Sequence, residues 1–148
     1  MSEKNRPNQE GAATPASRAH RTARWSEIIF RALSARVAQR WHFVSFRGPE
    51  GAESRGVVDI LAIRKNTSQP CGDVLKRGDL FDIVLIQLKG GSARAPTKDD
   101  CRRLREVARF YRARAVCQFC WRKGTPVTFL KLTRALDWRA TTSKELFG

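Results

Sequence analysis

Two polar side chains end an otherwise apolar segment of the chain, the run FDIVLIQLKGG over residues 81–91. Strand side chains alternate between two faces, so Gln87 and Lys89 are expected to point the same way. Placing them among apolar residues costs free energy unless polar groups lie nearby. A second predicted strand, VVDILAI over residues 57–63, carries the carboxylate of Asp59. A carboxylate, a carboxamide and an ammonium at the ends of two neighbouring strands predict a site that holds Mg²⁺ beside a phosphodiester.

The charge of the chain indicates a polyanionic partner. Its 148 residues include 29 Lys and Arg against 14 Asp and Glu, a formal net charge of +15. Such an excess is typical of proteins that bind nucleic acid. Basic proteins can also bind membranes, but no segment here reaches the roughly 18 apolar residues of a membrane span. We therefore expect nucleic acid and not a membrane as the partner, and the sequence points to no specific protein partner.

The length fits one domain preceded by a short arm. Residues 1–22 are polar, basic and poor in large apolar side chains, so we expect a flexible basic arm and then a single domain over residues 23–148. The arm lacks the apolar core of a secretory signal, which predicts a cytoplasmic protein with free thiols. Cys117 and Cys120 form a lone C-x-x-C, for which structural zinc and small buried side chains are the two interpretations.

The order of helical and extended segments predicts an α/β fold with a mixed sheet and helices on its faces. Strands are expected at residues 42–46, 57–63, 81–89, 115–121 and 126–132, with an extended hairpin loop over residues 64–79. A short helix or tail is expected from Ser143. The first helix is expected over residues 25–41, with a core stripe formed by Trp25, Ile28, Ile29, Leu33, Val37 and Trp41.

A second predicted helix, over residues 97–114, begins at Thr97 as its N-cap. Its core stripe is expected to be Cys101, Leu104, Val107, Ala108 and Tyr111. Beside that stripe lies a basic ridge that we expect to contact phosphates, although a solvated helix face is the alternative. The ridge consists of Arg102, Arg105, Arg109 and Arg112.

This arrangement resembles the PD-(D/E)xK nuclease superfamily, whose restriction-endonuclease-like fold is shared by restriction enzymes, Holliday-junction resolvases and repair nucleases. The resemblance covers residues 27–132 and depends on Glu27, Asp59 and the segment from Gln87 to Lys89. It is strongest to small Holliday-junction resolvases and to Mrr-like endonucleases, and the Mrr-like endonucleases often carry Q-x-K. It implies the element order α-β-β-β-α-β-β and a Mg²⁺-dependent endonuclease that hydrolyses phosphodiester bonds of duplex or branched DNA.

The resemblance also implies a role for each residue. Asp59 would coordinate Mg²⁺ directly, or Mn²⁺ in its place, with the side chain of Gln87 and the backbone carbonyl of Leu88 as further ligands. Lys89 would orient or help to deprotonate the attacking water, and Glu27 would hold a metal-bound water or a second ion. The product would carry a 5'-phosphate. Because Gln87 offers a neutral oxygen where glutamate is usual, the metal is expected to bind less tightly.

Other interpretations of the same residues remain open. Asp73 is nearer to the QLK segment in sequence, but Asp59 is preferred because it lies within a strand. Asp59 could instead pair with Arg55 or Arg64, and Glu27 in a first helical turn could simply favour the helix dipole. The alternative function is a non-catalytic nucleic-acid-binding protein with a degraded site. Cleavage of both DNA strands needs two active sites, so the nuclease hypothesis is compatible with a homodimer.

Overall fold

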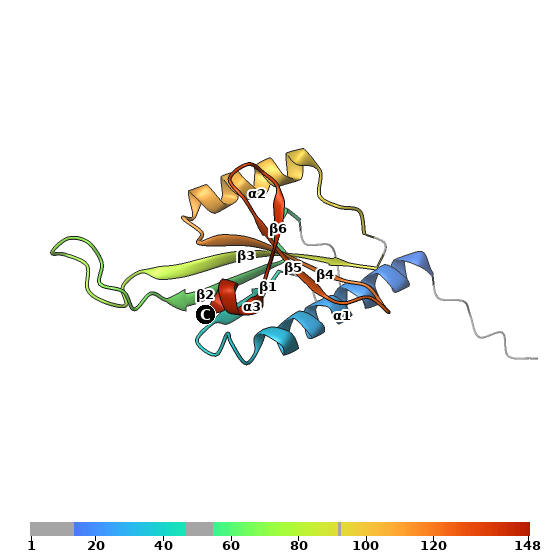
Figure 1. Cartoon of the computed structure of the whole chain (residues 1–148), viewed down its shortest axis with the longest axis horizontal. Coiled ribbons are helices and arrows are strands. Elements are labelled where there is room, and N and C mark those ends of the chain that lie inside the picture. Colours follow the sequence, from blue (N-terminus) through green and yellow to red (C-terminus); the bar gives the residue numbers. More distant parts are fainter. Residues whose placement is uncertain (1–13, 47–54, 92) are drawn as a thin grey trace, which may run out of the picture.

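A six-stranded mixed sheet runs through the centre of the molecule and carries helices on both faces (Figure 1). The computed structural model describes residues 14–46, 55–91 and 93–148. The strands lie in chain order, β3 and β4 are parallel, and every other neighbouring pair is antiparallel. They are β1 (His42–Ser45), β2 (Ile60–Lys65), β3 (Phe81–Gly90), β4 (Ala115–Trp121), β5 (Thr128–Leu132) and β6 (Trp138–Thr141). The predicted α/β class is confirmed, and β6 is an additional strand.

The helices divide the core into two layers. Helix α1 (Pro15–Ser34) and the short α3 (Ser143–Phe147) pack on one face of the sheet, and α2 (Lys98–Phe110) packs on the other (Figure 1). Phe30 is the centre of the first layer, with the rings of Phe43, Phe119 and Phe147 at 5.4–6.1 Å from its own. The side chains of β3 alternate between the two layers of the core: Ile86 faces α1, whereas Leu85 faces α2.

Helix α1 differs from the prediction at both ends. It begins at Pro15 because the side chain of Thr14 caps it and proline suits the first turn, so residues 15–22 of the expected flexible arm are helical. Residues 1–13 of that arm lie outside the described residues. The helix ends at Ser34, not at Trp41, although Trp41 is buried after the turn that follows.

The predicted core stripe of α1 was partly wrong. The side chains of Trp25, Ile28 and Leu33 are 45–50% exposed, whereas Ser26, Phe30 and Ser34 are fully buried. Ser26 is satisfied inside its own helix, where its hydroxyl donates to the Thr22 carbonyl at 2.9 Å. Small serines let the helix approach the sheet closely, and a count of apolar residues does not reveal such a face.

Helix α1 and the sheet approach each other closely at Gly90, the last residue of β3. A Cβ at this position would collide with the hydroxyl of Ser26 and would lie 2.9 Å from Thr22 Cγ2. We expect Gly90→Ala to lower the free energy of unfolding by about 1–3 kcal/mol, because the tightly packed site cannot accept an added methyl group. Denaturant unfolding of Gly90→Ala, Ser26→Ala and the double variant checks this. The double variant should lose less than the two single losses combined, and simple additivity would contradict the packing.

Helix α2 begins where the sequence predicts and ends earlier. Thr97 and Asp100 form a capping box, and the helix stops at Phe110, after which Arg112 takes a left-handed conformation with φ 51°. Cys101, Leu104 and Ala108 of the predicted stripe are buried, but Tyr111 is 58% exposed. The short C-terminal helix is confirmed as α3.

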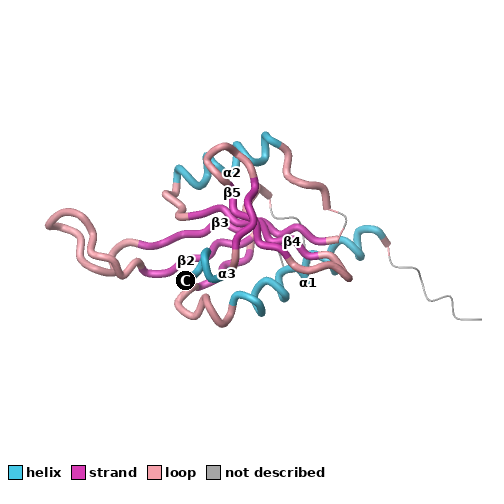
Figure 2. Tube along the Cα trace, viewed as in Figure 1, coloured by secondary structure: helices cyan, strands magenta, loops and turns pink. Residues whose placement is uncertain are grey.

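The hairpin loop between β2 and β3 projects from the body of the molecule (Figure 2). Asp73 lies in this loop. The predicted start of the second strand at residue 57 was wrong, because β2 begins at Ile60, and Asp59 lies just before the strand and not within it, at the end opposite the loop. Because β3 runs its whole length between the loop and Gly90, Asp73 is separated from the QLK segment, which leaves Asp59 as the nearer acid. None of the helices within the described residues is long and apolar enough to cross a membrane.

Candidate metal and phosphate site

The carboxylate of Asp59 reaches the QLK segment directly. Its Oδ2 accepts a hydrogen bond from the backbone N–H of Leu88 at 2.7 Å. The hydrogen-bond ladder between β2 and β3 is irregular here. Ile86 of β3 pairs in register with Ile60, but its carbonyl accepts a hydrogen bond from the N–H of the preceding residue, Asp59, at 2.9 Å. Irregular pairing of this kind re-aims a side chain and is common beside active sites. The structure therefore places the Asp59 carboxylate against the backbone of Leu88, between Gln87 and Lys89 in the sequence.

The carbonyl of Leu88 faces the same side as this hydrogen bond. The N–H and C=O of one strand residue point to the same neighbouring strand, so the carbonyl of Leu88 is directed toward the Asp59 edge of β3. A carboxylate oxygen and a backbone carbonyl oxygen thus lie on one edge of β3. Both are hard oxygen ligands of the kind that Mg²⁺ prefers.

The side chain of Gln87 lies under α2 and has a partner that the sequence analysis missed. Gln87 is paired in register with Gln118 of β4, and the Gln118 amide donates to Gln87 Oε1 at 3.3 Å. The two side chains are 7% and 3% exposed. The Gln87 oxygen keeps a second lone pair for another ligand. The signal for Gln118 was available in AVCQFCW, where one amide interrupts an apolar strand as Gln87 does in β3.

Lys89 lies next to Cys120 in the register and near the first turn of α2. Hydrogen bonds from the backbone and side chain of Thr97 hold the pKa of Asp100 below its usual value, with smaller contributions from the charges of Arg103 and Lys89. Lys89 is a partly buried residue, and its charge is close enough to the helix start to act on Asp100.

Glu27 lies at the same corner of the sheet, on the α1 face. Its carboxylate accepts from Ser45 Oγ and from Arg31 Nε, each at 3.1 Å, and its side chain is 13% exposed. Ser45 pairs in register with Ile60, the residue after Asp59. Because α1 begins at Pro15, Glu27 is not in the first turn, and the helix-dipole interpretation of this residue was wrong.

The geometry does not support a pairing of Asp59 with Arg64 or a zinc site at Cys117 and Cys120. Arg64 pairs with Asp82, Nε to Oδ2 at 3.0 Å, and stacks on Trp41. Cys117 is buried in the α1-side core, whereas Cys120 is paired in register with Lys89 on the α2 side. Cys117 and Cys120 thus lie on opposite faces of β4, so the two thiols do not converge on one zinc ion. Within residues 14–46, 55–91 and 93–148, no group of three or more His, Cys, Asp or Glu side chains could hold a metal ion.

Burial changes the pKa values of the Cys117 and Cys120 thiols. Burial raises the pKa of Cys117 strongly, and proximity to Cys120 adds to the effect. Burial also raises the pKa of Cys120, although a hydrogen bond with Thr128 and the charges of Arg122 and Lys89 oppose it. Both groups are therefore protonated thiols at neutral pH, as expected of small buried side chains.

No protein-family model matches this chain, and no curated protein has a matching sequence. The geometry of the site is consequently the basis for inference about its chemistry.

The predicted basic ridge of α2 is divided between different environments. Arg102 pairs with Asp99 at 2.6 Å and Arg109 with Glu106 at 2.9 Å, both on the exposed surface. Arg105 instead turns to the β5–β6 connection, where its guanidinium donates to backbone carbonyls. Exposed ion pairs are weak, so Arg102 and Arg109 can exchange their partners for a phosphate at small cost.

Proposed function

We propose that this chain is a metal-dependent DNA endonuclease with a restriction-endonuclease-like fold of the PD-(D/E)xK superfamily. The observation that carries the proposal is the 2.7 Å contact between the Asp59 carboxylate and the Leu88 amide, which places an acid beside the QLK end of β3. The observed order α1-β1-β2-β3-α2-β4-β5, which β6 and α3 follow, is also consistent with it, because the resemblance rests on that arrangement of helices and strands. The net charge of +15 supports DNA as the substrate.

The donor set suits Mg²⁺ or Mn²⁺. Asp59, the Gln87 amide oxygen and the Leu88 carbonyl would hold the ion, and all three are hard oxygen donors. A bound ion would polarise the phosphodiester and lower the pKa of the attacking water. Lys89 would orient that water and stabilise charge on the phosphate. Glu27, held by Ser45 and Arg31, would orient a second water at the same corner.

A second function is supported by a different observation. The oxygen of Gln87 already accepts a hydrogen bond from Gln118, and its amide brings no negative charge to the site. A site with one charged ligand beside β3 holds Mg²⁺ weakly. The alternative is therefore a DNA-binding protein on the same fold that does not cleave.

A cleavage assay separates the two functions. We expect the full chain to cut DNA in Mg²⁺ or Mn²⁺, to leave 5'-phosphate ends and to stop when EDTA is added, because the ion supplies the charge that the transition state needs. A four-way junction, a linear duplex, a methylated duplex and a single strand should be compared at equal concentration. Salt-sensitive binding with no cleavage in either metal would instead support the non-catalytic alternative.

A further inference from the structure

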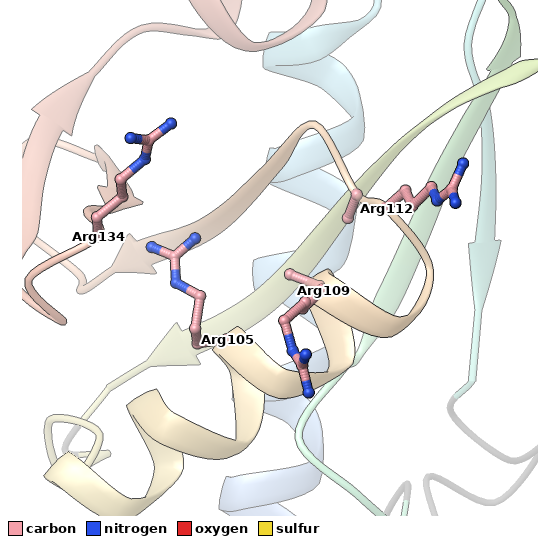
Figure 3. A pocket seen from close by; sticks show the side chains of 6 residues that line it. Arg105, Arg109, Arg112 and Arg134 are labelled. Atoms are coloured by element: carbon pink, nitrogen blue, oxygen red, sulfur yellow. The ribbon is translucent and has the colours of Figure 1, made fainter.

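We propose that a pocket between the C-terminal end of α2 and the β5–β6 turn is a binding site for phosphoryl groups. The pocket has a volume of about 450 Å³. Arginines dominate its lining, and no carboxylate of the described residues belongs to it. The residues that line it are Arg105, Ala108, Arg109, Arg112, Ala113 and Arg134. In Figure 3, Arg105 and Arg134 extend from two different elements toward the same space, and Arg109 and Arg112 stand at the helix end.

The positive charge of this pocket is only partly balanced by the protein. Among the described residues, Arg109 is the one arginine of the four that pairs with a carboxylate, that of Glu106, and this pair is exposed. Within the described parts of the chain, the side chains of Arg112 and Arg134 make no ion pair or hydrogen bond. Arg105 and Arg134 direct two positive charges toward the same space, and an anion that binds between them relieves their repulsion.

Arg105 holds the two walls of the pocket together. Its guanidinium donates to the carbonyl of Leu132 at 3.4 Å and to that of Thr133, which ties α2 to the turn. Its Nε is buried without a hydrogen-bond partner among the described residues. The charge of Arg105 is therefore fixed in place but is met only by neutral carbonyl groups, which leaves it for an anion to neutralise.

Basic residues at the end of a helix can simply complement the negative end of the helix dipole. That explanation covers Arg109 and Arg112 but not Arg134, which follows β5 in the turn. The turn is itself ordered by hydrogen bonds from the Thr133 N–H to the Asp137 carbonyl at 2.8 Å and from the Leu136 N–H to the Thr133 carbonyl at 3.2 Å. The second wall thus brings a cation to the pocket independently of the helix.

The link to DNA rests on the nuclease function proposed above. The first turn of α2 lies near Lys89, and the pocket lies at the other end of this 13-residue helix. At 1.5 Å per residue the helix spans about 20 Å. Phosphates of one DNA strand are about 3.4 Å apart along the duplex, so for a duplex that lies along α2 the pocket would take phosphates roughly six nucleotides from the scissile bond. The contact would fix the position of the cut.

Binding of inorganic tripolyphosphate tests the pocket without DNA. The ligand should raise the thermal midpoint of the full chain, and the variant Arg112→Gln/Arg134→Gln should lose at least half of that shift. Arg139→Gln is the matched control, because Arg139 is exposed on β6 and pairs in register with Lys131, away from the α2 side where Trp138 packs. An undiminished shift in the double variant, or an equal loss in the control, would overturn the proposal.

Salt-dependent binding of a 20-base-pair duplex identifies the source of the phosphate. Each lost phosphate contact reduces the magnitude of the negative slope of log Kobs against log salt by about 0.9. The slope of the double variant should therefore be smaller in magnitude by about two, and that of Arg139→Gln should not change. An unchanged slope with a lost tripolyphosphate response would overturn the DNA link and indicate a free phosphorylated ligand. Both responses can be measured in EDTA, so a chain that shows them but never cleaves contradicts the nuclease function alone.

Discussion

Asp59→Asn is expected to reduce Mg²⁺-dependent DNA cleavage by about a thousandfold while the protein stays folded. The asparagine oxygen can still accept the hydrogen bond from the Leu88 N–H, which is 2.7 Å from the carboxylate in the parent chain, but it brings no charge to the ion. A bound metal contributes several kcal/mol of transition-state stabilisation, and each 1.4 kcal/mol is a factor of ten in rate. Initial cleavage rates at saturating Mg²⁺ and thermal midpoints should both be measured.

Lys89→Met should give a loss of similar order, because the water and the phosphate then lack a neighbouring cation. Asp73→Asn and Lys131→Met are matched controls, since Asp73 lies in the projecting loop and Lys131 is exposed on β5. Neither control should change the rate. Nicking by Asp59→Asn and Lys89→Met at the rate of the parent chain would show that the site was assigned to the wrong residues.

DNA affinity in EDTA provides a second readout for these variants. Affinity without metal should change little in Asp59→Asn, because most of the binding energy comes from contacts between basic side chains and phosphates. Asp59→Ala is less informative, since it leaves the Leu88 N–H without its acceptor and costs about 1–3 kcal/mol in stability. A loss of DNA binding in Asp59→Asn that equals its loss of cleavage would point to a folding defect.

The strands and the neighbours of the QLK segment could be predicted because their signals are local. The apolar runs of β2, β3 and β4 mark buried strands, and the order strand, helix, strand predicts the parallel pairing of β3 with β4. The position of Asp59 beside these residues then follows from β2 and β3 being neighbours in the sheet.

The buried face of α1 and the different environments of the α2 arginines could not be predicted from the sequence, because both depend on tertiary packing. The buried face of α1 is built on Ser26, Phe30 and Ser34, so the apolar residues Trp25 and Leu33 indicated the wrong face. On α2, helical spacing places Arg105 and Arg109 on one surface. Which of them turns to the β5–β6 connection depends on a segment more than twenty residues further along the chain.

The proposed cleavage of DNA depends most on Gln87. In the structure its amide is nearly buried and is paired with Gln118, which makes it a stable part of the sheet and not a free ligand at the surface. A stable amide can be a neutral ligand in a weak metal site or part of a site that has lost its metal. The two possibilities predict different effects of a negative charge at position 87 on Mg²⁺ binding and on cleavage. A single substitution tests which of them is correct.

Gln87→Glu should lower the Mg²⁺ concentration that gives half-maximal cleavage by about tenfold, because the number of charged ligands sets the affinity of an oxygen site. The new carboxylate would be nearly buried, where desolvation disfavours its charged form. Without Mg²⁺ the variant should therefore be less stable than the parent chain. With Mg²⁺ its thermal midpoint should rise more steeply, because tighter binding to the folded state stabilises it more at a given concentration.

Gln118→Glu is the control for this prediction, since it places the same charge one strand further from Asp59. This variant should lose stability without metal but should not gain Mg²⁺ affinity. If Gln87→Glu and the parent chain respond alike to Mg²⁺, Gln87 is not a ligand and the metal site must be sought elsewhere. If Gln87→Glu cleaves DNA and the parent chain binds it without cleavage, the fold has lost its activity through this one amide, and Asp59 and Lys89 have kept their catalytic geometry.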